Sequence, residues 1–185
     1  MAKHLFLTGE KGVGKSTLIK GLLAQYHGSL GGFFTVKSAF AVPGRISVHL
    51  LRADRRERPT LENLLFSCGE PAGPAVTDRF DRLGCAALTA EPSADLLVMD
   101  ELGPHEADAR SFCRAALQAL DGNIPILGVL QRADVPFLAQ IAAHPQVRLV
   151  EGTVKNRDEL ARTLYLPTAM ARMEETRHRD LPSEC

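Results

Sequence analysis

The stretch GEKGVGKSTLIKGLL, residues 9–23, decides the fold of this chain. Its first eight residues fit the pattern G-x-x-x-x-G-K-[ST]. The preceding residues 4–8, HLFLT, have the character of a short buried strand, and residues 16–25 place their apolar side chains on one helical face. A strand, a glycine-rich loop and a helix in this order are typical of a P-loop, which binds phosphate groups.

Each part of this loop has a chemical role in holding a nucleotide. The glycines allow backbone N–H groups to converge on phosphate oxygens, and the positive end of the following helix adds to the field. We expect Lys15 to bridge the β- and γ-phosphates, the Ser16 hydroxyl to ligate Mg²⁺, and Thr17 to contact the α-phosphate region. The predicted nucleotide-binding residues of the loop are Gly9, Glu10, Lys11, Gly12, Val13, Gly14, Lys15, Ser16 and Thr17.

The composition sets the class of protein. The chain has 185 residues, 45% of them hydrophobic, which suits a single domain with a core over residues 1–166 and a charged helix or tail over 167–185. Because 22 basic residues balance 22 acidic ones, we expect no nucleic-acid partner, and the sequence identifies no protein partner.

The sequence also indicates a location. No stretch approaches the roughly 20 apolar residues of a membrane span, and the apolar N-terminal run is too short for the core of a signal peptide. The four cysteines show no CxxC or CxxH spacing, so a metal cluster is not expected. These features predict a soluble, cytoplasmic protein without a membrane partner.

Apolar runs bounded by turn residues alternate with stretches of helical period, which predicts an α/β fold with a mainly parallel sheet. Two β-rich runs around Pro43 and Gly44 predict a hairpin at an antiparallel margin. Residues 52–59 read as a charged surface loop, and the Gly- and Pro-rich residues 68–76 as a connection or lid. Further strands are expected at 94–101, 124–131 and 147–152, and further helices at 106–120, 135–143 and 158–164.

A second motif bears on what happens to the phosphates. The run LLVMDE, residues 96–101, matches a Walker B strand that ends in two carboxylates. We expect Asp100 to bind Mg²⁺ through water and Glu101 to orient and deprotonate an attacking water. Ligands bind at the carboxyl edge of a parallel sheet, and the two carboxylates at the end of this strand lie on that edge. Their position favours hydrolysis. The alternative for Glu101 is an ordinary carboxylate at a turn or helix start.

Phosphoryl transfer to water gains from a cation near the γ-phosphate. Arg132, which follows the strand expected at 124–131, is the candidate, and with Glu101 and Lys15 it completes the predicted catalytic set. Arg157 follows the next strand; either arginine could instead be an ordinary surface residue. Lys11 lies one position later than the signature lysine of dimeric partitioning-type ATPases, so a solvated lysine is expected there.

In its ordered set of motifs the chain resembles the cancer-related nucleoside-triphosphatase family. The resemblance rests on LTGEKGVGKSTL (7–18), GGFFT (31–35), DELGPHE (100–106) and NRDEL (156–160). It implies a P-loop NTPase with a RecA-like three-layer sandwich and slow Mg²⁺-dependent hydrolysis of ATP, GTP or other NTPs, with broad base preference. It also implies that Glu101 is the base, that Asp100 is at the metal, and that Glu106 is a second acidic residue. The positions of Asn156 and Arg157 imply contact with the base or ribose.

Some residues depart from the family's pattern. Lys37 and Ser38 stand where the family has a glutamate and an arginine, and His105 replaces a hydrophobic residue of the acidic motif. The family's Gly-x-Tyr pattern is missing, with residues 73–76 nearby. These departures lie away from the phosphate site, so they bear on the substrate more than on hydrolysis.

Two other functions use the same loop. A small-molecule or nucleoside kinase would replace water by an acceptor and would need an arginine-rich lid, for which residues 52–58 are the candidate. A nucleotide-dependent switch would bind an NTP tightly with little turnover and would order a loop on binding. The carboxylate of Glu101 beside Asp100 favours hydrolysis over the kinase, whereas the switch stays open, because a slow NTPase can be both an enzyme and a switch.

Overall fold

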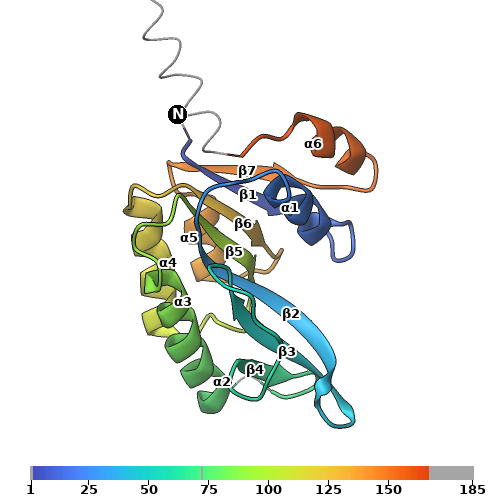
Figure 1. The fold of residues 1–185 in the computed structure, drawn as a ribbon, viewed down its shortest axis with the longest axis vertical. Helices are drawn as coiled ribbons and strands as arrows, with labels where there is room; N and C mark the ends of the chain where they lie inside the picture. The colour runs from blue at the N-terminus through green and yellow to red at the C-terminus, as the bar shows by residue number, and fades with distance from the viewer. Residues whose placement is uncertain (1, 72, 167–185) are drawn as a thin grey trace, which may run out of the picture.

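The computed structural model describes residues 2–71 and 73–166 (Figure 1). The charged helix or tail expected at 167–185 lies outside the described residues. No helix within the described ranges is long and apolar enough to cross a membrane.

A seven-stranded sheet, in the order β4-β3-β2-β5-β6-β1-β7, forms the centre of the structure. Its strands are β1 (His4–Thr8), β2 (Leu30–Val42), β3 (Arg45–Arg52), β4 (Leu64–Ser67), β5 (Leu96–Leu102), β6 (Ile126–Leu130) and β7 (Val147–Glu151). The pairs β2–β5, β5–β6, β6–β1 and β1–β7 are parallel. The pairs β2–β3 and β3–β4 are antiparallel. The predicted parallel sheet with an antiparallel hairpin margin is therefore confirmed.

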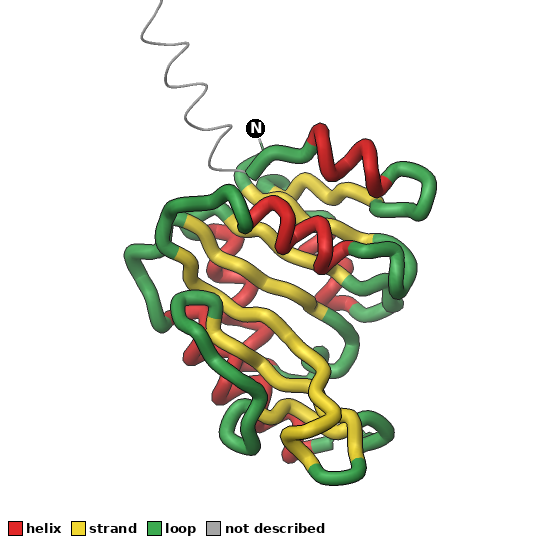
Figure 2. Tube along the Cα trace, turned by 45° about the vertical axis from the view of Figure 1, so that its right-hand side comes forward, coloured by secondary structure: helices red, strands yellow, loops and turns green. Residues whose placement is uncertain are grey.

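Helices cover both faces of this sheet, which gives the three layers expected (Figures 1 and 2). The helical segments are α1 (Lys15–Leu23), α2 (Pro74–Arg79), the π-helix η1 (Phe80–Gly84), α3 (Cys85–Thr89), α4 (Arg110–Asp121), α5 (Pro136–Ala142) and α6 (Arg157–Thr163). The helices α1 and α6 contact each other on one face, and the segments from α2 to α5 lie on the other. Each face has its own cluster of buried apolar residues.

The larger cluster is organised around the ring of Phe112 in α4. The rings of Phe33, Phe80 and Phe137 lie with their centroids 5.7, 6.0 and 6.4 Å from that of Phe112. A Cβ on Gly84 would lie 2.2 Å from a Phe112 ring carbon, so only glycine lets this helical segment approach so closely. The core thereby fixes η1 and α4 against the middle of the sheet.

Two local predictions were wrong in part, and two elements were not predicted. The strand β4 and the helical residues 74–89 were not foreseen, and the expected connection at 68–76 ends in α2, whose first turn begins at Pro74. Proline suits the first turn of a helix, so the Gly- and Pro-rich composition hid a helix start. The helix α4 begins at Arg110 instead of residue 106, and the residues before it form turns in which the Ala109 N–H donates to the Glu106 carbonyl oxygen at 2.9 Å.

Candidate active site

The P-loop after β1 is held closed by its own lysine. Gly9, Gly12 and Gly14 have φ of 131°, 87° and 100°, which non-glycine residues rarely adopt. The Lys15 Nζ donates to the carbonyl oxygens of Gly9 at 2.9 Å and Glu10 at 2.8 Å, and Lys15 is only 7% exposed. The lysine is therefore already fixed at the loop where a phosphate would bind.

The first glycine also joins the loop to the end of β7. A Cβ on Gly9 would lie 2.1 Å from the Gly152 carbonyl oxygen, and the Gly152 N–H donates to the Thr8 carbonyl at 2.8 Å. Val13 is buried beneath the loop, whereas Thr17 in the first turn of α1 is exposed. The glycines of the motif thus serve packing as well as backbone freedom.

A hydroxyl from α1 meets a carboxylate from β5. The Ser16 Oγ donates to Asp100 Oδ1 at 3.2 Å, and Asp100 is 3% exposed. Burial raises the pKa of Asp100 to about 6, although its hydrogen bond with Ser16 acts in the opposite direction. Such a pair of oxygen ligands fits Mg²⁺, which usually takes one or two protein ligands and completes its shell with phosphates and water.

The metal would depend on the nucleotide. Within the described ranges no group of three or more His, Cys, Asp or Glu side chains is arranged to hold a metal ion. Ser16 and Asp100 alone would give a weak site, and the phosphates of a bound nucleotide would supply further oxygen ligands.

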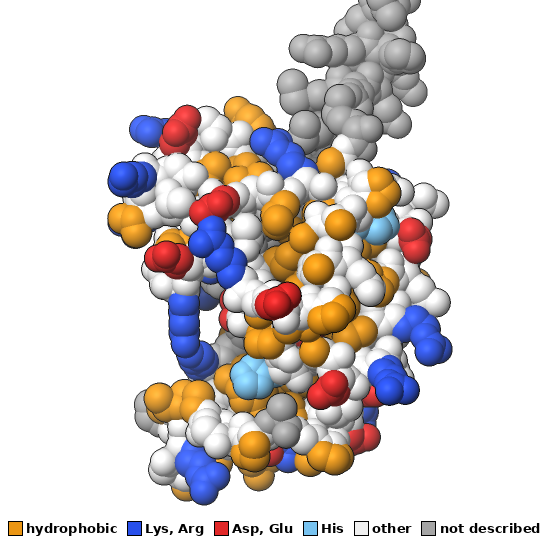
Figure 3. All heavy atoms as spheres, turned by 180° about the vertical axis from the view of Figure 1, so that it is seen from behind, with side chains coloured by type: hydrophobic (Ala, Val, Ile, Leu, Met, Phe, Trp, Pro, Cys, Tyr) orange, Lys and Arg blue, Asp and Glu red, His pale blue; other side chains and the backbone are white. Residues whose placement is uncertain are grey.

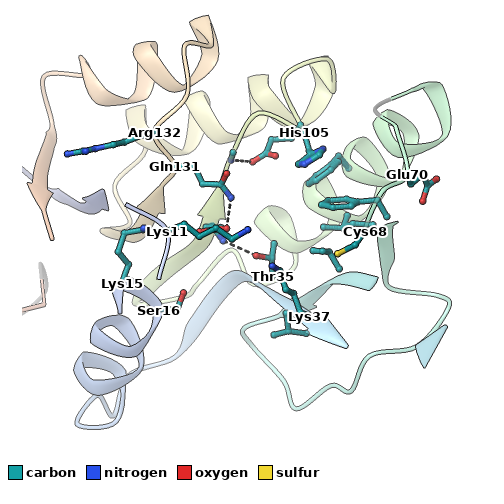
Figure 4. Close-up of a pocket in the computed structure, with 18 of the residues that line it drawn as sticks. Lys11, Lys15, Ser16, Thr35, Lys37, Cys68, Glu70, His105, Gln131 and Arg132 are labelled. Carbon is teal, nitrogen blue, oxygen red and sulfur yellow. Dashed lines mark hydrogen bonds between the residues drawn. The ribbon is translucent and has the colours of Figure 1, made fainter. Parts of the chain in front are cut away.

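Glu101, on β5, is held in position by residues from the two neighbouring strands, β2 and β6. Its backbone N–H donates to Thr35 Oγ1 at 3.2 Å, from β2, and its carboxylate accepts a hydrogen bond from the Gln131 amide, which follows β6 (Figure 4). The structure places Glu101 in the same cleft as Lys15. Thr35 and Gln131 were not predicted; the position of Gln131 at the end of an expected strand was the signal that could have identified it.

Glu106 supports the loop that follows β5. Its buried carboxyl accepts a hydrogen bond from the Gly103 N–H, and its carbonyl oxygen accepts one from Cys113 Sγ at 3.3 Å. Burial is the main cause that raises the pKa of Glu106 to about 8, against the hydrogen bond from Gly103. This side chain is therefore largely a neutral acid at pH 7, and the backbone carbonyl of Glu106 connects the loop to α4.

One cleft of about 650 Å³ unites these groups. Its phosphate end is lined by Gly9, Glu10, Lys11, Lys15 and Ser16, and its middle by Thr35, Glu101, Gly103, Glu106 and Gln131. It continues past Glu101 towards β3 and β4. The predicted phosphate-binding and catalytic motifs thus face a single cavity.

The candidate cations behave differently from one another. The Lys11 side chain points into the cleft (Figure 4), whereas Arg132 lines the cleft and forms an ion pair with Glu151. The Arg157 Nε lies 3.6 Å from Asp158 Oδ1, and Arg157 does not line the cleft. The structure therefore brings Lys11 to the phosphate end, engages Arg132 in an ion pair at the edge of the cleft, and leaves Arg157 outside it.

Asn156 also lies apart from the cleft and stabilises the loop after β7. Its side-chain oxygen accepts from the Thr153 N–H at 2.7 Å, and its side-chain nitrogen donates to the Glu151 carbonyl at 2.9 Å. The predicted contacts of Asn156 and Arg157 with the base or ribose remain predictions.

The fold and the site together define a class of protein. A lysine-bearing P-loop, a buried aspartate beside the P-loop serine, and a glutamate fixed in the same cleft are the parts of a P-loop nucleoside triphosphatase. A family model for NTPases matches residues 4–165, and the chain belongs to that family.

Comparisons with individual proteins agree with this assignment. The chain is 32% identical over 140 residues to the nucleoside-triphosphatase THEP1 of Thermococcus kodakarensis, covering 71% of this chain and 78% of that protein. It is 31% identical over 185 residues to the THEP1 of Thermofilum pendens, covering 92% and 94%. By family the chain is a nucleoside-triphosphate phosphohydrolase.

Two solved structures share the fold. The crystal structure of THEP1 from Aquifex aeolicus has a TM-score of 0.66 at 22% identity and covers 86% of this chain and 95% of that one. The solution structure of a human cancer-related nucleoside triphosphatase has a TM-score of 0.59 at 20% identity, with 94% and 98% covered. Both support the α/β fold with a mostly parallel sheet.

Proposed function

We propose that this chain hydrolyses nucleoside 5'-triphosphates to the diphosphate and phosphate in a Mg²⁺-dependent reaction, with Glu101 as the general base. The observation that carries the proposal is the fixed position of Glu101 in the cleft that also holds the P-loop lysine. A carboxylate that accepts a hydrogen bond from Gln131, on a backbone held by Thr35, can orient a water without a costly rearrangement.

The phosphate end binds the substrate. The Lys15 Nζ exchanges its two loop carbonyl oxygens for β- and γ-phosphate oxygens, and the loop N–H groups bind the remaining phosphate oxygens. Ser16 and Asp100 would hold Mg²⁺, which when bound neutralises charge on the phosphates. Lys11, whose side chain points into the cleft, adds a positive charge near the γ-phosphate.

The chemical step is transfer of the γ-phosphoryl group to water. Glu101 accepts a proton from the attacking water as its oxygen bonds to the γ-phosphorus, and the bond to the β,γ-bridging oxygen breaks. The Gln131 amide keeps the carboxylate turned towards the cleft. Broad base preference is part of the proposal, because the Asn156 amide is already bonded within its own loop.

We also infer that the protein acts in the cytoplasm. Cys68, Cys85 and Cys113 are free thiols, which suits a reducing compartment. We also propose that nucleic acid is not a partner, since Figure 3 shows acidic and basic side chains interspersed over the face that it draws.

The test is phosphate release from ATP, GTP, CTP and UTP with Mg²⁺, for the wild type, Glu101→Gln and Lys15→Ala. We expect Glu101→Gln to lose about 100-fold or more of kcat while it still binds nucleotide, since a general base contributes that much. Lys15→Ala should lose binding as well. Glu159→Gln, an exposed glutamate in α6, is the matched control. Full turnover by Glu101→Gln would rule out its role as the base.

A further inference from the structure

The cleft is longer than the phosphate site requires. Beyond Glu101 it continues to an end that we call the distal end, lined by Val48, Leu65, Phe66, Cys68, Phe80 and His105. These residues come from β3, β4, η1 and the segments next to them, on the opposite side of β5 from β1 and the P-loop. The distal end is therefore built by the antiparallel margin, which no part of the P-loop motif occupies.

The distal end has the chemistry of a site for a flat organic molecule. Val48, Leu65 and Phe80 are buried apolar residues. The rings of Phe66 and His105, which line the same end of the cleft, are stacked, with centroids 4.4 Å apart and planes at 29°. Sites for small molecules are typically apolar and aromatic with a few well-placed polar groups, and such walls favour an aromatic ring over water or phosphate.

One positive charge is available beside this surface. Lys37, on β2, lines the cleft and has no ion-pair partner among the residues that the structure describes. The neighbouring Glu70 is already engaged, since it accepts the Ser67 N–H at 2.9 Å and lies 3.3 Å from Arg79. The unpaired charge at the distal end is therefore positive and favours an anionic group on the ligand.

The triphosphate leaves this end of the cleft open. Its γ-phosphate would lie between Lys15 and Glu101, and the attacking group must approach from the side opposite the β-phosphate. The distal end lies beyond Glu101, on the side of the cleft away from the P-loop. An occupant there would share the cleft with the nucleotide and would meet the attacking water.

We propose that the distal end is a second binding site, for a small aromatic anion, which binds together with the nucleotide and controls access of water to the γ-phosphate. The binding itself follows from the lining residues; its effect on turnover rests on the proposed hydrolysis at Glu101. The ring would pack on His105 and Phe66, and the anionic group would pair with Lys37.

The test uses the fluorescent probe 8-anilinonaphthalene-1-sulfonate on the intact chain. We expect saturable binding whose Kd changes by less than about twofold when Mg²⁺ and a non-hydrolysable ATP analogue are added. Lys37→Ala should weaken the probe about two- to fivefold and His105→Ala several-fold, as expected for one exposed charge pair and one stacked ring. Lys155→Ala, an exposed lysine outside the cleft, should bind the probe like the wild type.

Two further measurements locate the probe and its effect. The probe should slow modification of the exposed Cys68 by N-ethylmaleimide, followed by peptide mass spectrometry, while the analogue alone should slow it less. In phosphate-release assays the probe should lower kcat and leave the KM for ATP within about twofold.

The outcomes separate this proposal from the proposed function. Displacement of the probe by the ATP analogue, or unchanged probe binding by both Lys37→Ala and His105→Ala, would overturn the second site. Unchanged kcat with the probe bound and Cys68 protected would overturn its control of water. Failure of the wild type to bind the analogue or to release phosphate would instead count against the proposed hydrolysis.

Discussion

At the scale of single residues, the site depends on hydrogen bonds that hold carboxylates in place. Glu101 is fixed by Gln131 and Thr35, and Glu106 by the Gly103 N–H. Each of these bonds joins groups that are polar and at least partly buried, so the loss of one partner changes the geometry or charge of the other.

Gln131→Ala tests the positioning of the base. Without its amide the Glu101 carboxylate can rotate, so we expect kcat to fall about tenfold with the KM for ATP nearly unchanged, since positioning acts on the chemical step. Steady-state phosphate release measures both constants. Gln118→Ala, on the exposed side of α4, is the control. A rise in KM without a change in kcat would show that Gln131 contacts the substrate instead.

Glu106→Gln tests the buried neutral acid. Burial raises the pKa of Glu106 from 4.5 to about 8. Its folded form thus binds more protons than the unfolded chain between these values, and its contribution to the free energy of unfolding is full below pH 4.5 and lost as the pH rises to about 8. We expect Glu106→Gln to reduce this loss by up to roughly 2 kcal/mol between pH 6 and pH 8.

Urea unfolding at a series of pH values measures this difference. Glu62→Gln, an exposed glutamate, should keep the wild-type pH dependence. Parallel curves for the wild type and Glu106→Gln would mean that the carboxyl is ionised in the folded protein.

At the scale of elements, the antiparallel margin is held by a buried polar network. His49 on β3 is fully buried; its Nε2 lies 2.7 Å from Ser47 Oγ, and its Nδ1 lies 3.0 Å from both the Thr60 carbonyl and Asn63 Oδ1. The two acceptors at Nδ1 indicate that Nδ1 carries the proton. Although Ser47, His49 and Asn63 are arranged like a hydrolytic triad, Ser47 is fully buried and has no access to a substrate.

His49→Ala should therefore weaken the margin. Removal of the ring leaves the Ser47 hydroxyl and the oxygens of Thr60 and Asn63 without this partner, at a cost of about 1–3 kcal/mol. The expected result is a lower Tm in thermal unfolding. His27→Ala, an exposed histidine, should leave the Tm unchanged, and an unchanged Tm for His49→Ala would contradict the network's role in stability.

At the scale of the whole molecule, the last described residues close the second core. Leu164 is 6% exposed and packs in the cluster that contains Leu5, Leu7 and Ile19. This cluster joins α1 and the segment after α6 to the sheet beneath the P-loop.

A chain that ends at residue 166 should therefore keep the fold and the activity. We expect its Tm to lie within about 2 °C of the full chain and its kcat to be unchanged, because the apolar residues that the structure describes in both clusters are retained. Leu164→Ala in the full chain should lose about 2–3 kcal/mol, as for other buried leucines. A truncated chain that unfolds or loses turnover would place part of the domain in residues 167–185.

Much of this protein was determined by segments that are continuous in the sequence. The P-loop and the LLVMDE strand carry their chemistry within a few residues, and their flanking apolar runs indicate a strand and a helix directly. The parallel sheet, the hairpin margin and the roles proposed for Lys15, Ser16, Asp100 and Glu101 followed from these local patterns.

The tertiary structure decided what depends on contacts between distant segments. Gln131 and Thr35 reach Glu101 from 30 and 66 residues away, and Arg132, which lines the cleft, is paired with Glu151 on another strand. The helical residues 74–89 and the distal end arise where separate segments pack on the margin of the sheet. Local sequence does not encode these contacts between distant segments, because burial against other elements overrides the propensity of a short segment.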